Sequence, residues 1–530
     1  MKTLVPPMKK VFARTGLRHS RIARGRPPRR GRWANSAIAA FLACGLALAG
    51  CSDSGAEGNS APESTVRVGI LGGPSDTLDI TNAATNLPYA VLLNVYDSLV
   101  LLQGGEFELQ LAESVTPNED ATRWTIAIRD GVTFHDGSPL TSTDVLYSLK
   151  YLAESANFGT IYGDVDFETS TIDDDLTLTL HLTRPRADFV EAMLSQLSPV
   201  FPDGTTDFTS PVGSGPFKLE SFSADSGAKL VRNEDYWGGA PAIEALEIVP
   251  IMDGSARLSA LTDGQVDIVT GLSATALGSL EGNDAFVIDD PGPTDSSAFT
   301  FHMNTSIPPF DDPEVREALR IGIDRQALVD VVLQGTGEIG NDLIGLGLPG
   351  YADGVPQREY DPGRAEEIFA EHGVTELGII VAELAPGLTD ATKLLQQQLA
   401  DLGVTLTITE ADPSTLFSNL EPVYATQLFT NYFNNRPAAV TLPVYLSPDS
   451  PYNFSQWKDP EYAELLTQSE TLVDDEARAT ALEDAQERLW AEGGDIVWGY
   501  QPNLGAHAKG LEGVSSTQSI PLFAEATITR

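Results

Sequence analysis

A strand, a helix and a second strand follow one another between residues 377 and 410. The first strand is predicted at residues 378–381 and the second at residues 404–408. The helix between them places its apolar residues on one face and ends at Gly403: Leu394, Leu395, Leu399 and Leu402. Two parallel strands need a crossover of this kind, so the segment predicts a parallel sheet covered by helices.

Alternating apolar and polar residues predict further strands along the chain, at residues 66–71, 123–129, 176–182, 217–222, 245–250, 266–269, 298–303 and 496–500. Apolar periodicity and capping residues predict helices at residues 89–102, 142–149, 256–261, 313–323 and 474–490. Two Asp-Gly pairs, at 130–131 and 136–137, predict tight turns around a hairpin. This pattern predicts an α/β fold with two lobes, and the crevice between such lobes is a favoured ligand site.

The first fifty residues have the composition of a signal peptide. They carry eleven basic residues and no acid, and the apolar stretch 37–50 is too short to span a bilayer as a mature helix. The stretch ends in Leu-Ala-Gly before Cys51, which predicts a bacterial lipobox with Cys51 as the lipidated N-terminus. Residues 51–63 are polar and rich in Gly, Ser and Ala, so we expect a flexible tether.

Charge excludes one class of partner. Without the signal peptide the chain has 22 basic residues against 75 acidic ones, a net charge of −53. Phosphates would be repelled, so no nucleic acid is expected to bind. The other cysteine, Cys44, lies in the signal peptide, and the mature chain therefore has no disulfide and no cysteine metal site.

Five motifs resemble solute-binding protein family 5, the extracytoplasmic subunits of peptide and nickel ABC importers. The first is WTIAIRDGVTFHDGSPLTSTDVLYSL at residues 124–149. The others, in the family's order, are VGSGPF at 212–217, NEDYWGGAP at 233–241, PFDDPEVR with IDR at 309–325, and NFSQWKDPEYAELL at 453–466. Together they cover roughly residues 64–500, which makes the resemblance specific.

The resemblance implies a two-lobed periplasmic-binding-protein-like (type II, Venus flytrap) fold with an extra subdomain in the first lobe. We expect the first lobe at residues 64–292 with the subdomain at about 98–204, the second lobe at 293–490, and a return to the first lobe at 491–530. The implied protein is a monomer, held by its lipid at the outer face of the cytoplasmic membrane in the cell envelope. It would capture a small solute, foremost a peptide or peptide-like compound, for an ABC permease with separate ATPase subunits.

The ligand contacts that the resemblance implies fall in one segment. Many peptide binders of the family read Gly-Trp-x-x-Asp-x-x-Asp-Pro there, and the first Asp grips the free amine. Aligned on Pro437, Phe433 replaces that Asp and Arg436 replaces the second acid. An anionic solute, a nickel chelate or a sugar therefore stays open as the ligand beside a peptide, because Arg436 suits a carboxylate or phosphate. The ligand-binding candidates are Asn82, Asn431, Tyr432, Phe433, Asn434 and Arg436.

No pattern of catalytic or cofactor-binding residues is found. The six histidines (His19, His135, His181, His302, His372 and His507) have no metal-ligand spacing, and no cofactor is expected. The chain lacks a nucleophile elbow and a P-loop, which argues against a hydrolase and against a built-in ATPase. A lipoprotein sensor or adaptor for a protein partner remains the alternative of another class, and it would need an exposed apolar patch.

Overall fold

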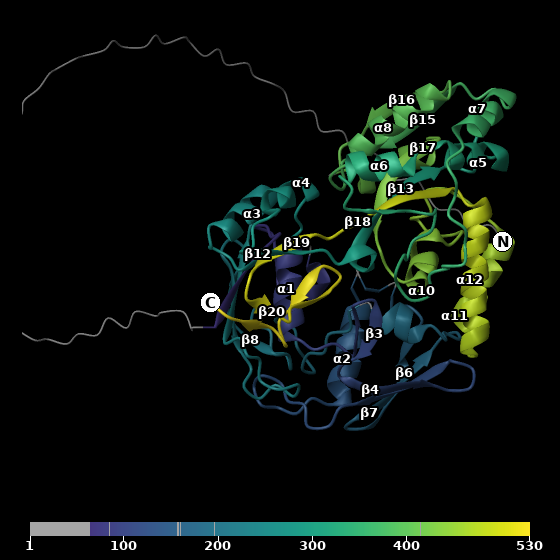
Figure 1. The fold of residues 1–530 in the computed structure, drawn as a ribbon. Helices are drawn as coiled ribbons and strands as arrows, with labels where there is room; N and C mark the ends of the chain where they lie inside the picture. Colours follow the sequence, from purple (N-terminus) through teal and green to yellow (C-terminus); the bar gives the residue numbers. More distant parts are fainter. Residues whose placement is uncertain (1–63, 84, 156–157, 160, 196, 414) are drawn as a thin grey trace, which may run out of the picture. The chain divides into compact units, whose positions relative to one another are not determined.

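The computed structural model describes residues 64–530 with the exception of 84, 156–157, 160, 196 and 414. The predicted signal peptide, the tether and Cys51 lie outside the described residues. Two mixed sheets organise the described part of the chain (Figure 1). We call each sheet with the elements packed on it a lobe.

The first lobe is built on a seven-stranded sheet of order β12-β19-β11-β1-β10-β9-β8. Its strands are β1 (Thr65–Ile70), β8 (Phe217–Ser223), β9 (Gly227–Arg232), β10 (Ala245–Pro250), β11 (Ile268–Thr270), β12 (Phe286–Asp289) and β19 (Gly505–Ala508). β1 runs parallel to both β10 and β11. Helix α1 (Asn86–Val95) packs on β8 and β10, and α3 (Gly254–Thr262) packs on β1 and β11, next to α4 (Ala274–Leu277).

A smaller antiparallel sheet is inserted into the first lobe between β1 and β8. It has the order β4-β5-β7-β6, from β4 (Ala112–Pro117), β5 (Arg123–Ile128), β6 (Val165–Asp174) and β7 (Thr177–Leu182), and α2 (Ser142–Ala153) packs on β6 and β7. The alternating residues of β5 and β7 bury Trp124, Ile126, Leu178 and Leu180 in one apolar cluster with Val66 and Val68 of β1. The inserted sheet therefore shares its core with the first lobe.

The second lobe is built on a six-stranded sheet of order β14-β18-β13-β17-β15-β16. Its strands are β13 (Ser296–Met303), β14 (Glu338–Ile339), β15 (Glu376–Val381), β16 (Thr405–Glu410), β17 (Leu428–Asn434) and β18 (Asp495–Pro502). One apolar cluster joins this sheet to α5 (Pro313–Gly322), α6 (Arg325–Val332), α7 (Pro362–Glu371) and α8 (Leu388–Asp401). Another joins it to α10 (Ala438–Thr441), α11 (Pro460–Thr471) and α12 (Asp475–Glu492).

The strand–helix–strand prediction is confirmed. β15 and β16 pair in parallel along their full lengths, α8 connects them, and Leu395 and Leu399 of α8 are buried in the core of the second lobe. Gly403 adopts a positive φ of 77° directly after the helix, where a residue without a side chain avoids strain. The periodicity of these residues was thus sufficient to predict their local structure.

The predicted helix at residues 89–102 is wrong in its second half. α1 ends at Val95, and residues Val100–Gln103 form strand β2, which pairs with β3 (Glu106–Leu109). The break lies at Asp97, whose buried carboxylate accepts hydrogen bonds from Ser214 Oγ (2.9 Å), Trp237 Nε1 (2.8 Å) and the Tyr236 hydroxyl (3.2 Å). These long-range bonds hold the chain out of the helix, and an unbroken apolar run cannot reveal them.

The two lobes are connected twice. The first connection is the short helix η4 (Gly292–Asp295), which leads directly into β13. The second follows β18, which pairs with β13 as far as Pro502, and β19 joins the first sheet from Gly505. The second crossing thus lies at residues 503–504, because residues 495–502 pair with β13 in the second sheet.

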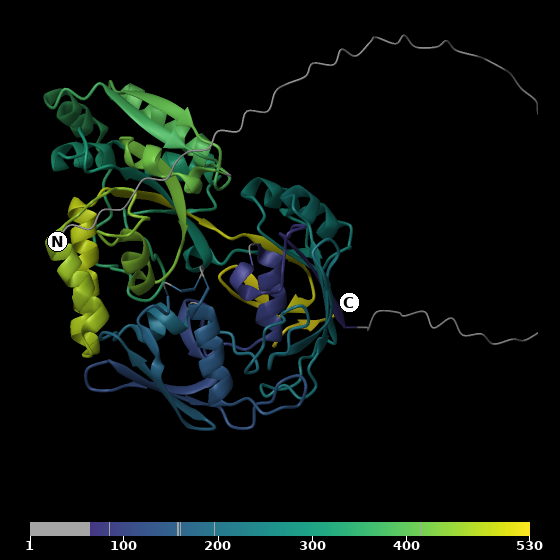
Figure 2. The same cartoon turned by 180° about the vertical axis from the view of Figure 1, so that it is seen from behind.

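The inserted sheet also contacts the second lobe. Arg184, after β7, forms ion pairs with Glu470 of α11 (2.5 Å) and with Asp164 (2.9 Å). The backbone N–H of Ala187 donates to the carbonyl oxygen of Glu470 (2.6 Å), and Arg478 of α12 donates to the carbonyl oxygen of Ala187. Figures 1 and 2 show α11 and α12 side by side, and these helices carry the second lobe's half of the contact.

His135 lies in the turn that follows β5 and is held as a neutral ring. Its Nε2 is 3.0 Å from the carbonyl oxygen of Gly215, and its Nδ1 accepts a hydrogen bond from the backbone N–H of Gly213 (3.3 Å). A protonated ring would lose that acceptor, and burial lowers the pKa of His135 from its ordinary 6.5 to about 4. A Cβ on Gly213 would lie 1.9 Å from the carbonyl oxygen of Val95, so the turn that His135 contacts requires glycine.

We predict that His135 makes folding stability depend on pH. Its pKa is lower in the folded chain than in the unfolded one, so its contribution is present above about pH 6.5 and is lost as the pH falls toward about 4. His135→Gln keeps a donor and an acceptor but does not titrate, so the gap in thermal midpoint between wild type and variant should narrow as the pH falls. A gap that stays constant from neutral to mildly acidic pH would contradict the prediction.

Candidate functional site

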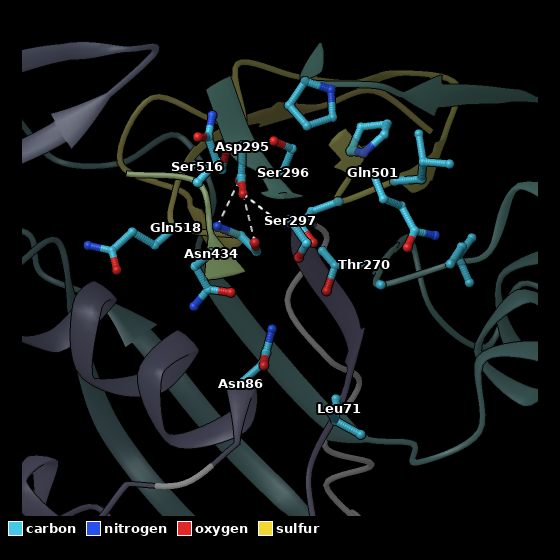
Figure 3. Close-up of a pocket in the computed structure, with 18 of the residues that line it drawn as sticks. Leu71, Asn86, Thr270, Asp295, Ser296, Ser297, Asn434, Gln501, Ser516 and Gln518 are labelled. Atoms are coloured by element: carbon cyan, nitrogen blue, oxygen red, sulfur yellow. Dashed lines mark hydrogen bonds between the residues drawn. The ribbon is translucent and has the colours of Figure 1, made fainter. Parts of the chain in front are cut away.

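A cavity of about 1120 Å³ lies between the two lobes (Figure 3). Residues at the carboxyl ends of parallel strands line it from both sides. Leu71, Met252 and Gly271 follow β1, β10 and β11 of the first sheet, while Leu384 follows β15 and Asn434 ends β17 of the second. Ligands of open α/β sheets bind outside the carboxyl ends of the strands, and domain interfaces are favoured ligand sites.

The back of the cavity is formed by the two connections and by a hairpin near the C-terminus. Ser296 and Ser297 start β13, and Gln501 is near the end of β18. The hairpin of β21 (Ser515–Thr517) and β22 (Ile520–Leu522) contributes Gln518 and Ser519. Figure 3 shows Asn86, Asn434 and Gln518 around one space although they come from α1, β17 and this hairpin.

Neutral amide and hydroxyl groups are the most frequent polar groups in the lining of the cavity. They are Asn86, Gln103, Ser255, Thr270, Ser273, Thr294, Ser296, Ser297, Asn434, Asn435, Gln501, Asn503, Ser515, Ser516, Gln518 and Ser519. Such groups both donate and accept hydrogen bonds, as the peptide group of a ligand requires. Tyr432 is the only aromatic residue among the described residues of the lining, so aromatic stacking has a small part here.

Asp295 lines the back of the cavity, but its carboxylate is already engaged. Oδ1 accepts hydrogen bonds from Asn503 Nδ2 and Ser519 Oγ, both at 2.7 Å. Oδ2 accepts one from the backbone N–H of Ser519, also at 2.7 Å. The dashed lines in Figure 3 mark hydrogen bonds in this region. Asp295 thus ties the two connections and the C-terminal hairpin together.

Arg257 of α3 provides a buried positive charge in the wall of the first lobe. Its side chain donates to the carbonyl oxygens of Thr270 (2.9 Å) and Gly271 (2.6 Å), and to those of Ile251 (2.7 Å) and Met252 (3.0 Å). Arg257 is only 5% exposed, and burial lowers the pKa of its guanidinium below the ordinary value. It forms no ion pair with any described residue, so carbonyl dipoles, with the charge of the nearby Asp253, compensate its charge.

Arg436 follows β17 and reaches from the second lobe to the first. Its Nη2 is 3.4 Å from Oε1 of Gln518, which is a long hydrogen bond, and its buried Nε has no partner among the described residues. Burial raises the pKa of the nearby Tyr89 hydroxyl, and the positive charge of Arg436 opposes that shift. Arg436 forms no ion pair within the described part of the chain either.

The structure brings three of the six predicted ligand residues to the cavity. Tyr432, Asn434 and Arg436 line it. Asn431 and Phe433 are buried on the opposite face of β17, because successive side chains of a strand alternate. Phe433 packs there against Tyr445 and Phe454, which corrects the expectation that it faces the crevice.

Asn82 does not line the cavity. It is exposed in the short helix η1 (Ile80–Asn82), and its Nδ2 donates to Asp79 Oδ2 at 2.8 Å. Asn86, four residues later at the start of α1, lies at the cavity instead. The sequence thus predicted correctly that the segment after β1 contributes to the cavity. The start of helix α1 places Asn86, and not Asn82, in the lining.

Other lining residues were missed in the sequence. Thr270 and Gly271 follow a short strand, and the rule that ligands bind at carboxyl ends of parallel strands could have identified them. Gln518 and Ser519 carry no comparable signal. They adopt positive φ angles of 47° and 68° in a turn that only the assembled hairpin explains.

One Ser–Asp–His arrangement outside the cavity is structural. His302 Nδ1 lies 2.6 Å from Asp495 Oδ1, and Ser455 Oγ donates to Asp495 Oδ2 at 3.1 Å. The serine bonds the acid and not the histidine, and all three residues are buried, so no nucleophile is activated and no substrate reaches them. Within the described residues, no group of three or more His, Cys, Asp or Glu side chains could hold a metal ion.

In the described part of the chain, no helix has both the length and the apolar character that crossing a bilayer requires.

Known proteins share both the sequence and the fold. A model of the bacterial extracellular solute-binding proteins, family 5 Middle, matches residues 106–464, which is more than half of the chain. Glutathione-binding protein GsiB of Salmonella paratyphi A is 26% identical over 465 residues, covering 84% of this chain and 90% of that protein.

Two solved structures have the same fold. HbpA2 from Haemophilus parasuis superposes with a TM-score of 0.78 at 21% identity, covering 88% of this chain and 100% of that one. DppA from Helicobacter pylori, in complex with a peptide, superposes with a TM-score of 0.70 at 20% identity, covering 88% and 98%. The two-lobed periplasmic-binding-protein fold predicted from the sequence is thereby confirmed.

The family match also decides the class of function, since family 5 consists of solute-binding transport proteins and not of enzymes. With its two sheets, its interlobe cavity and the match over residues 106–464, the chain belongs to the bacterial extracellular solute-binding proteins of family 5.

Proposed function

We propose that this protein is the substrate-binding subunit of an ABC importer and captures a peptide or peptide-like solute in the interlobe cavity. The observation that carries the proposal is the lining itself, in which amide and hydroxyl side chains from both lobes surround about 1120 Å³. That volume is slightly above the range of about 300–1,000 Å³ that is usual for small-molecule pockets. A GsiB relative named for glutathione, a peptide-like compound, and a peptide-bound DppA structure support the same class.

A non-peptide anionic solute is the second candidate, and Arg436 is the observation that favours it. A guanidinium without an ion-pair partner suits any carboxylate or phosphate, whatever the rest of the molecule. A nickel chelate is one ligand of this anionic class, because the acids that chelate nickel carry carboxylates. A sugar is less favoured, since Tyr432 is the single aromatic side chain among the described residues that line the cavity.

The remaining features of the proposal follow from the sequence. Residues 1–50 act as a signal peptide, Cys51 carries the lipid, and residues 51–63 tether the lobes to the outer face of the cytoplasmic membrane. The monomeric protein delivers its ligand to permease subunits, while separate ATPase subunits supply energy. Tyr432, Asn434 and Arg436 contact the ligand. The proposed lobes are residues 64–292, with the inserted subdomain at about 98–204, and 293–490, and the segment 491–530 contains the return to the first lobe.

We predict that the protein retains a ligand through purification. Native mass spectrometry of residues 64–530, purified from the source organism, should show a mass above that of the chain. Denaturation should release a peptide or a peptide-like compound. A thermal-shift screen of peptide pools should raise the midpoint, because a ligand that binds only the folded state stabilises it. Release of a non-peptide acid, with no shift by any peptide pool, would replace the first candidate by the second.

Membrane attachment is predicted to depend on Cys51. In the full-length chain, Cys51→Ser removes the only thiol that a lipoprotein pathway could modify after the apolar stretch. The variant should leave the membrane fraction and lose incorporation of labelled fatty acid, while Cys44→Ser should keep both. A Cys51→Ser protein that is still labelled would refute the lipobox.

A further inference from the structure

We infer that Arg436 is a specificity residue that binds a carboxylate of the ligand, and that the cavity therefore selects solutes with a free carboxylate. For a peptide this group is its C-terminus. The inference rests on the proposed function and deepens it. It specifies that the carboxylate end of the ligand, and not its amine, is bound by a charged side chain.

The first step is the absence of a protein counter-ion for Arg436. The chain has 75 acidic residues against 33 basic ones, and several buried arginines pair with them. Arg186 pairs with Asp188 at 2.7 Å, and Arg325 pairs with Asp342 at 2.6 Å. Arg436 has no such pair among the described residues, and its buried Nε bonds to nothing there. A partly buried charge is costly unless it is paired, so an anionic ligand is its natural partner.

The second step is that the cavity lacks an equally placed acid. Asp295 already accepts three hydrogen bonds from Asn503 and Ser519. Asp253 caps α3 by accepting from the backbone N–H of Ala256 at 2.8 Å, and it is exposed. Glu108 is also exposed, on the β2–β3 hairpin, where water screens its charge. Phe433 replaces the acid with which many family members bind an amine, and it faces away from the cavity.

The third step is the sign of the charge on the opposite wall. Arg257 is buried in the first lobe, where four carbonyl oxygens accept its hydrogen bonds and no described carboxylate is within ion-pair distance, although the charge of Asp253 acts on it. Each lobe therefore presents one unpaired guanidinium to the same cavity. Both guanidinium groups favour a bound anion, while the three described carboxylates of the same lining, Glu108, Asp253 and Asp295, oppose it, the first two screened by water and the third hydrogen-bonded.

The fourth step is the geometry of Arg436 itself. Its only side-chain hydrogen bond within the described part of the chain is the long one to Gln518, on the opposite lobe. A charge-assisted bond to a carboxylate is shorter and stronger than a bond of this kind. A ligand carboxylate can therefore replace Gln518 as the acceptor, or accept a second hydrogen bond from Arg436. The guanidinium already lies at the cavity, between the two lobes.

The test uses two pools of random tri- and tetrapeptides that contain no Asp or Glu, one with free C-termini and one with C-terminal amides. Wild type, stripped of ligand by denaturation and refolding, should retain the free acids at least about 10-fold better than the amides, the range of a charge-assisted bond. Arg436→Ala should lower retention of the acids to that of the amides. Arg436→Lys should keep part of the preference, since it keeps the charge but loses the planar fork.

Arg123→Ala is the matched control, because Arg123 is exposed on β5, forms no ion pair with a described residue and lies outside the cavity. It should retain the full preference although the net charge changes equally. Equal retention of acids and amides by wild type would refute the inference and leave peptide binding intact. An Arg436→Ala protein that loses both pools alike would show that Arg436 only holds the lobes together. Retention of neither pool by wild type would instead overturn the peptide function on which the inference rests.

Discussion

The arrangement of the two lobes depends on the hydrogen bonds of Asp295. This residue ends the first connection between the sheets, and its backbone carbonyl accepts from the N–H of Asn503, in the second connection, at 3.0 Å. Its carboxylate binds the side chain of Asn503 and both donors of Ser519. Asn503 and Ser519, which follow Asp295 by 208 and 224 residues, are thus both fixed at one side chain. The back of the cavity exists because these bonds form together.

The position of the cavity follows from the direction of the parallel strands. β1, β10 and β11 end toward it from the first sheet, and β15 and β17 end toward it from the second. Chains leaving such strands have unpaired backbone groups and side chains that are free of the sheet, so polar residues gather there. Arg257 donates hydrogen bonds to carbonyl oxygens that follow the strands in this way, those of Thr270, Gly271, Ile251 and Met252. These bonds join the segments that follow β10 and β11 in the wall of the first lobe.

Local patterns predicted what depends on local physics and failed where distant contacts decide. The α8 crossover and strand β10 were predicted almost to the residue, because periodicity and turn residues determine them. The helix at 89–102 was overextended, since Asp97 is held by Ser214 and Trp237 from far along the chain. In β17, the resemblance identified the segment, but the alternation of the strand separates Tyr432 and Asn434 from Asn431 and Phe433. Gln518 could not be predicted, because its place depends on the hairpin that Asp295 anchors.

The contact between the inserted sheet and the second lobe bears on how such a cavity opens. Arg184, Glu470 and Arg478 join the lobes at a site distinct from the two connections. A rotation about residues 292–295 and 503–504 that separates the cavity walls must break these bonds or carry the inserted sheet along with α11 and α12. The inserted sheet shares its core with the first lobe, from Trp124 to Val66, and so cannot follow α11 and α12 freely. A movement that parts α11 from the inserted sheet would therefore separate Arg184 from Glu470, and the ion pair opposes such a movement. Because Glu470 is largely buried while Arg184 is partly exposed, part of that opposition escapes screening by salt.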